Sequence, residues 1–196
     1  MSSTVSAPTF TEAEYLALER VSDRKHEYVD GLIVAMAGAR PPHNLLVTNL
    51  TVLLHPAARD RGCVVLGSDQ RVHVAATGLY TYPDLIVACG HRRYRDDEPP
   101  SLLNPTILVE VTSDTTENHD RGAKFVHYQT IDSLAEYVVV SHRAPRVEHH
   151  RKLETGQWLL TVANAVGSSV QLASLDLELR VGDVYRDIDL DEGLQR

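Results

Sequence analysis

The sequence predicts an α/β fold in which helices flank a mixed β-sheet that antiparallel strands extend toward the C-terminus. Short runs rich in Val, Ile and Leu predict strands in the middle of the chain. A helical segment separates the runs at 107–111 and 137–140, which predicts a strand, helix, strand unit. Beyond residue 146, short strands alternate with turns, a pattern typical of antiparallel pairing.

Length and composition predict one domain with one substantial core. The chain has 196 residues, 43% of them hydrophobic, which is short for two independent domains. We expect a loose N-terminal tail at 1–10, a single α/β domain at 11–186 and a polar tail at 187–196. No leader-like segment or bilayer-length apolar run is visible, which predicts a cytoplasmic location.

The N-terminal elements have strong local signals. Thr11 and Glu14 form the pattern of a capping box and predict a short helix that ends near Arg20. Next, Asp30-Gly31 separates two strand-like runs at 26–29 and 32–36, because a tight hairpin turn requires positive φ at its centre.

The remaining elements follow from periodicity and turn residues. Apolar residues at helical spacing predict a helix over 43–60, closed by Arg61-Gly62. A second long helix is expected at 116–131. The predicted strands lie at 63–66, 71–75, 84–88, 107–111, 137–140, 146–152, 158–163 and 170–172. The polar segment 91–100 is either a solvated loop or a basic arm that faces a substrate.

Charge and cysteine usage narrow the possible functions. A net charge of −8 argues against a surface that binds nucleic acid everywhere, so any such contact must be local. Cys63 and Cys89 lie in apolar runs and lack the close spacing of a redox or zinc pair. We therefore predict two buried thiols.

Two carboxylates stand within apolar strands and point to chemistry. Asp84 follows Tyr82-Pro83, and Glu110 lies inside the run at 107–111. An ionised side chain in a buried strand must be paired, protonated or bound to a cation. If the two strands are neighbours, both carboxylates can meet one ion, and oxygen ligands favour Mg²⁺ or Mn²⁺ over zinc.

The helix after Glu110 adds a cation to this pair. Lys124 and Tyr128 share a helical face with His127, so they can reach the same cleft. Two carboxylates and an ammonium suit phosphodiester hydrolysis, in which a metal ion polarises the phosphoryl group and Lys124 orients the attacking water.

Structural interpretations of the same residues stay open. Glu110 and Lys124 form an ordinary ion pair in this alternative, Asp84 caps the start of its strand, and Asp120 pairs with Lys124 along the helix. Histidines form a second alternative, a zinc site, for which a matched Cys/His spacing is missing. Its candidate ligands are His142, His149 and His150.

Several motifs together resemble one known family over nearly the whole chain. They are the run from Thr11 to Leu16, the hairpin from Glu27 to Gly31, His43, Tyr82-Pro83-Asp84-Leu85, Val109-Glu110-Val111-Thr112-Ser113, Asp120-Arg121-Gly122-Ala123-Lys124-Phe125, and the strand at 137–140. With these motifs the chain resembles the Uma-type restriction endonucleases of the PD-(D/E)XK nuclease superfamily. The resemblance implies a restriction-endonuclease-like sheet and a metal-dependent nuclease site.

The resemblance also implies roles for individual residues. Asp84 is the acidic residue of the PD element and Glu110 the acidic residue of the second half-motif. Thr112 stands where the superfamily usually has its lysine, and Lys124 from the adjacent helix is the substitute. Glu27 resembles the additional acidic residue of such sites, with a structural salt bridge as its alternative.

Three further residues are candidates for contact with the substrate: His43, Gln70 and Tyr128. His43 either contacts phosphate or caps its helix, and the Gln70 amide either faces the cleft or bonds to backbone. We hypothesise an Mg²⁺- or Mn²⁺-dependent endonuclease that hydrolyses DNA, and a homodimer, because two strands require two sites. The alternative is a catalytically inactive binding or scaffold protein with the same fold.

Overall fold

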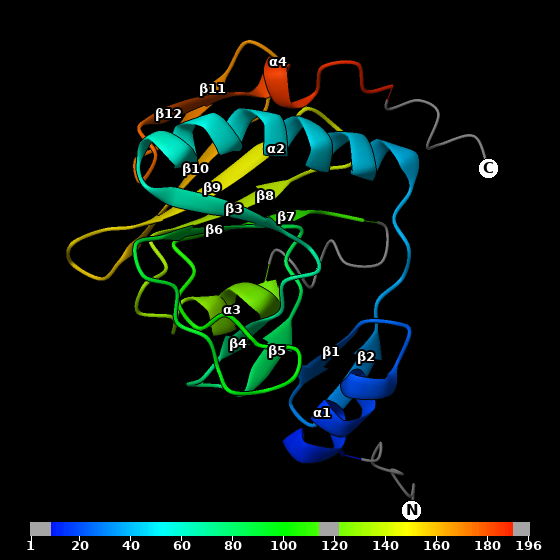
Figure 1. Ribbon diagram of the computed structural model, residues 1–196. Helices are drawn as coiled ribbons and strands as arrows, with labels where there is room; N and C mark the ends of the chain where they lie inside the picture. Colours follow the sequence, from blue (N-terminus) through cyan, green and yellow to red (C-terminus); the bar gives the residue numbers. More distant parts are fainter. Residues whose placement is uncertain (1–8, 114–121, 190–196) are drawn as a thin grey trace, which may run out of the picture.

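A six-stranded mixed sheet forms the centre of the molecule (Figure 1). The computed structural model describes residues 9–113 and 122–189. The strands are Cys63–Gly67 (β3), Leu85–Cys89 (β6), Ile107–Val111 (β7), Glu136–Val140 (β8), Val147–Lys152 (β9) and Trp158–Ala163 (β10). Their spatial order is β10-β9-β8-β7-β6-β3, in which β7 and β8 run parallel and the other neighbours antiparallel.

Helix α2, Pro41–Asp60, covers one face of this sheet (Figure 1). Its residues Leu46, Leu50 and Leu54 recur at four-residue spacing and are fully buried, as the periodicity of the sequence predicts. The helix begins two residues before the predicted start, with Pro41 and Pro42 in its first turn, where a missing N–H costs nothing. It ends before Gly62, which has φ +67°.

A second, four-stranded sheet lies on the side of the main sheet opposite α2 (Figure 1). Its strands are His26–Val29 (β1), Leu32–Ala35 (β2), Val72–Val74 (β4) and Leu79–Thr81 (β5), in the order β2-β1-β5-β4. The predicted hairpin is confirmed, with φ of 50° and 82° at Asp30 and Gly31. β5 is only three residues long and was not predicted from the sequence.

The predicted N-terminal helix is also confirmed. Helix α1 spans Glu12–Val21, and both hydrogen bonds of the capping box between Thr11 and Glu14 are present. Tyr82 and His26 both bind Glu19 near the end of this helix, at 2.7 and 3.1 Å, and so attach α1 to the strands beneath it.

The strand, helix, strand unit is present, and β7 and β8 are parallel as it requires. Its helix α3 spans Lys124–Tyr128, so it ends before the predicted boundary at residue 131. The first part of the predicted helix, residues 116–121, lies outside the described residues. Most of the two predicted tails, residues 1–8 and 190–196, lies outside them as well, and the domain boundaries stay a prediction.

The C-terminal part extends the sheet by antiparallel strands, as predicted. β9 pairs with β8, and β10 pairs with β9. A separate two-stranded sheet of Ser169–Leu172 (β11) and Leu177–Arg180 (β12) follows, and Val181–Val184 forms the short helix α4. Neither β12 nor α4 was predicted from the sequence. In Figure 1 these elements lie on the same side of the main sheet as α2.

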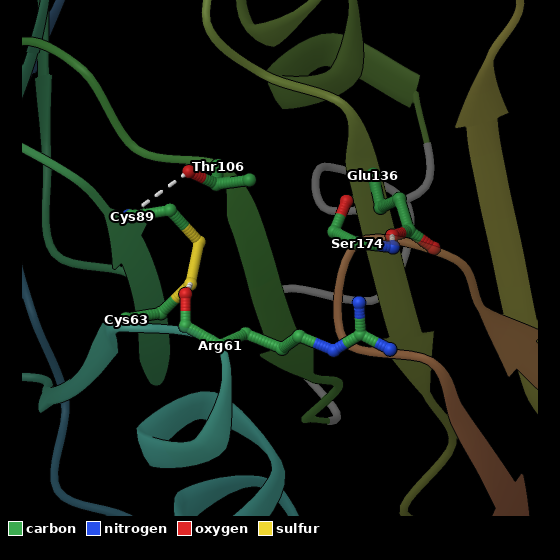
Figure 2. Close-up of a disulfide and its surroundings, with 6 residues drawn as sticks. All are labelled: Arg61, Cys63, Cys89, Thr106, Glu136 and Ser174. Atoms are coloured by element: carbon green, nitrogen blue, oxygen red, sulfur yellow. Dashed lines mark hydrogen bonds between the residues drawn. A yellow bond between two sulfur atoms is a disulfide. The ribbon is translucent and has the colours of Figure 1, made fainter.

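The prediction of two buried thiols is wrong, because Cys63 and Cys89 form a disulfide (Figure 2). The two residues are 26 positions apart in the sequence, and this spacing gives no local indication that they are bonded. The antiparallel register of β3 and β6 places them directly opposite each other. The side-chain oxygen of Thr106, just before β7, accepts the Cys89 backbone N–H at 3.1 Å (Figure 2).

In the described ranges, no helix combines the length and the apolar character that a membrane crossing needs.

Candidate functional site

The register of β6 and β7 places the two predicted carboxylates side by side. Leu85 pairs with Val109, so in this antiparallel pair the preceding Asp84 faces Glu110. Side chains alternate along a strand, and Glu110 therefore points to the face that carries α3 and the smaller sheet. Two carboxylates that are distant in the sequence meet at one edge of the main sheet.

Asp84 lies where the backbone enters β6 and is held from two sides. Its Oδ2 atom accepts the backbone N–H of Val111 at 2.7 Å and lies 3.3 Å from Nε2 of His43. His43 comes from the first turn of α2, so the helix on the opposite face of the sheet reaches this edge. Both contacts engage Oδ2, and the Asp84 side chain is 17% exposed, so its other oxygen can bind a cation from solvent.

Glu110 is buried and bonds to two side chains of α3. Its Oε1 atom lies 3.2 Å from Nζ of Lys124 and accepts the Tyr128 hydroxyl at 2.9 Å. Lys124 and Tyr128 are four residues apart, so they project from the same face of the helix. The predicted helical face is therefore correct for both residues.

Glu27 joins the same cluster from the smaller sheet. Its Oε1 atom lies 2.9 Å from Lys124 Nζ and accepts the Thr81 hydroxyl at 2.5 Å. Tyr28 pairs with Tyr80, so the antiparallel register of β1 and β5 sets Glu27 opposite Thr81. Thr81 is a member of the site that the sequence analysis missed, since β5 itself carries no clear signal.

Burial and charge set the protonation state of Tyr128. Burial raises the pKa of the Tyr128 hydroxyl well above its ordinary value, and the carboxylates of Glu110 and Glu27 raise it further. The phenol thus stays neutral and donates to Glu110. Because Lys124 faces two carboxylates and Asp84 lies at the same edge, negative charge exceeds positive charge among these groups.

Gln70 lies apart from this cluster. Its amide donates to the backbone carbonyls of Arg71 and Pro100 at 2.9 and 3.0 Å, as the structural alternative predicts. Asp120, the other proposed partner of Lys124, lies outside the described residues.

The histidines of the zinc alternative have other partners. His142 bonds to Thr112 at 2.9 Å, and His149 bonds to buried Glu136 at 2.6 Å. Burial raises the pKa of Glu136, but hydrogen bonds from His149 and Ser174 outweigh burial and hold the pKa below its usual value. Figure 2 shows Ser174 next to Glu136. In the part of the chain that the structure describes, no three His, Cys, Asp or Glu side chains gather into a metal site.

Comparison with known proteins identifies the family. The sequence pattern of Uma2, described as "Putative restriction endonuclease", matches residues 12–182. The chain belongs to the Uma2 family. The matched range includes every candidate site residue of this Uma2 chain, from Glu27 to Tyr128.

Two relatives of this Uma2 chain come from Synechocystis sp. (strain ATCC 27184 / PCC 6803 / Kazusa). "Uncharacterized protein sll1609" is 34% identical over 167 residues, 85% of this chain and 94% of the relative. "Uncharacterized protein slr1290" is 32% identical over 179 residues, 91% of this chain and 93% of the relative.

A solved structure confirms the predicted fold of the Uma2 chain. The "putative nuclease belonging to DUF820" from Anabaena variabilis ATCC 29413 superposes with a TM-score of 0.73 over 90% of this chain and 97% of its own. The two sequences are only 16% identical, so this likeness concerns the fold alone. The restriction-endonuclease-like mixed sheet predicted from the sequence is therefore correct.

Proposed function

We propose that this Uma2 chain is a divalent-metal-dependent endonuclease that hydrolyses phosphodiester bonds in DNA. The observation that carries the proposal is the meeting of Asp84 and Glu110 at one sheet edge, with the Lys124 ammonium 3.2 Å from Glu110. Membership in a family described as restriction endonucleases supports the reaction class and the DNA substrate.

The donor set fits a hard divalent cation. Mg²⁺ commonly binds proteins through one or two carboxylates and keeps several waters, so it does not need three protein ligands. Asp84 and Glu110 would hold the ion, and carboxylate oxygens are hard ligands that suit Mg²⁺ or Mn²⁺. When bound, Mg²⁺ or Mn²⁺ lowers the pKa of water and polarises the phosphoryl oxygens.

The residues of this chain provide the positioning. Water forms the new bond to phosphorus and gives up a proton to solvent, while the P–O bond to the departing ester oxygen breaks and that oxygen takes up a proton from solvent. Lys124 orients the attacking water and offsets negative charge that develops on the phosphoryl oxygens. Glu27 holds Lys124 from the opposite side, at 2.9 Å, and the neutral Tyr128 hydroxyl holds Glu110. His43, whose Nε2 lies 3.3 Å from Asp84, would contact a substrate phosphate.

The first test measures cleavage of supercoiled DNA, linear DNA and RNA by purified protein in Mg²⁺, Mn²⁺ or EDTA. We expect DNA cleavage that needs the metal and that Asp84→Asn or Glu110→Gln abolishes. Asn retains an oxygen that can accept the Val111 N–H, so Asp84→Asn preserves the local fold. Asp176→Asn is the matched control, because Asp176 is an exposed aspartate that pairs with Arg61. Undiminished cleavage by Asp84→Asn would refute the assignment.

Calorimetric titration with Mn²⁺ separates this proposal from the inactive scaffold. An active centre takes up Mn²⁺, and Glu110→Gln weakens the uptake. The scaffold alternative, which rests on Thr112 at the usual lysine position, predicts neither uptake at millimolar Mn²⁺ nor cleavage.

We also infer a homodimer, since cutting both strands of a duplex requires two sites. Light scattering should then give twice the mass of one chain, and the mass of one chain would contradict a stable dimer.

A further inference from the structure

Three consecutive residues at the end of β7 and just beyond it each provide or contact a polar side chain. Glu110 provides a carboxylate of the site, and the backbone N–H of Val111 donates to Asp84 at 2.7 Å. The Thr112 hydroxyl lies 2.9 Å from Nδ1 of His142. Residues in a strand advance by about 3.3 Å each, so Thr112 lies only about 7 Å along the strand from Glu110.

Thr112 and His142 meet because β7 and β8 are parallel and end at the same edge. Val111 pairs with Val140, and the Thr112 N–H donates to the Val140 carbonyl at 2.9 Å. Just beyond β8, the backbone N–H of His142 donates to the Thr112 hydroxyl oxygen at 3.2 Å. Thr112 is fully buried, so the position of its hydroxyl is well defined by the residues packed around it.

The neighbouring arginine determines which nitrogen of the His142 ring carries the proton. Nε of Arg143 lies 3.3 Å from Nε2 of His142, and a guanidinium N–H can only donate. Nε2 of the neutral ring therefore accepts, and its proton resides on Nδ1, which donates to Thr112. The hydrogen bonds form one relay from Thr112 through His142 to Arg143.

This relay holds Nε of Arg143 next to His142, just beyond the end of β8 and at the same end of the sheet as Glu110. Arg143 lies on the surface, whereas Lys124 is buried between Glu27 and Glu110. A nucleic acid carries one negative charge on each phosphate, so a guanidinium at this end of the sheet adds a favourable contact to a phosphate that flanks the one held at the metal site. A guanidinium fits this task because it presents paired N–H donors to two phosphate oxygens.

We propose that Arg143 binds a backbone phosphate of the nucleic-acid substrate, and that Thr112 and His142 are positioning residues that act through it. The proposal rests on the proposed function and deepens it. It also gives Thr112, at the position of the usual superfamily lysine, a role in holding the substrate rather than in the chemical step.

The test measures binding of a fluorescently labelled DNA duplex by anisotropy in EDTA, which separates binding from metal-dependent hydrolysis. Arg143→Gln should weaken binding by about tenfold to 100-fold, as expected for lost hydrogen bonds to a charged group. It should also make the plot of log affinity against log salt concentration less steep, by the amount that one phosphate contact contributes. Arg61→Gln is the matched control, because Arg61 is an exposed arginine at the far end of α2.

Variants of Thr112 test the relay. Thr112→Ser retains the hydroxyl and should bind DNA like the wild type. The nearly isosteric Thr112→Val removes the oxygen that accepts the His142 N–H, so it should weaken binding and also lower the melting temperature, and its binding is measured well below that temperature. In the double variant, Thr112→Val should add nothing to Arg143→Gln, because the relay acts through Arg143.

Each outcome is decisive. The proposal is overturned if Arg143→Gln and Arg61→Gln weaken binding equally, or if the losses in the double variant are additive. It is also overturned if the wild type binds neither DNA nor RNA. If the wild type binds through Arg143 and cuts no nucleic acid with any metal, the proposed nuclease function fails and the phosphate site stands.

Discussion

Replacing Lys124 by Met should strongly destabilise the protein, because its ammonium contacts two buried carboxylates. The Lys124 and Glu110 side chains are each 5% exposed and Glu27 is 11% exposed, with contacts of 3.2 and 2.9 Å to the ammonium. Met fills a similar volume, so the substitution removes charge and leaves little cavity.

The expected loss follows from the charges that stay behind. Breaking one buried ion pair costs about 3–5 kcal/mol, because the partner is left buried and uncompensated. Because Lys124 contacts two carboxylates, we expect Lys124→Met to lower the free energy of unfolding by an amount at the upper end of this range, about 4–5 kcal/mol. In a chain of this size each kcal/mol lowers the melting temperature by about 2–4 °C, which predicts a fall of about 8–20 °C.

Urea unfolding in EDTA measures this loss. Fluorescence of the single tryptophan, Trp158, reports on this region because its ring packs edge-on against Phe125, the neighbour of Lys124, at 5.2 Å. The control Arg180→Met removes an exposed pair with Glu178 and should cost no more than about 1 kcal/mol.

A double variant tests the physical cause. Lys124→Met with Glu27→Gln should be more stable than Lys124→Met alone, because one uncompensated charge is gone. The explanation fails if Lys124→Met melts within about 2 °C of the wild type, which corresponds to a stability loss of less than about 1 kcal/mol. The ammonium would then not balance the two carboxylates.

Three further predictions concern single interactions. Tyr128→Phe removes the donor to Glu110 and should cost about 1.5–3 kcal/mol in urea unfolding, and an unchanged midpoint would rule out that bond. The pKa of Glu136 is lowered in the folded state, so its contribution to stability is present above the unfolded pKa, about 4.3, and is lost as pH falls below that value. Glu136→Gln should therefore flatten the acid limb of the stability curve, and an identical limb would contradict the shift. The Cys63–Cys89 disulfide closes a loop of 26 residues, so its reduction should lower the free energy of unfolding by about 3.5 kcal/mol. The double variant Cys63→Ser/Cys89→Ser should be insensitive to the reductant. If it responds to the reductant as the wild type does, the disulfide is not the cause.

The carboxylates of the main sheet were visible in the sequence because an ionised residue in an apolar strand is costly and stands out. Lys124 and Tyr128 were visible for a different reason, since helical spacing alone sets them on one face. Thr81 could not be found in this way, because its strand is three residues long and its partner Glu27 comes from another hairpin.

Sequence alone therefore determined the local elements and the residue types of the site, since capping boxes, hairpin turns and periodic apolar runs are local signals. Strand pairing decided the rest. The register of β6 against β7 brought Asp84 to Glu110, and that of β3 against β6 joined Cys63 to Cys89. Such contacts link residues far apart in the chain, and they depend on which buried faces pack together, which no short window of sequence encodes.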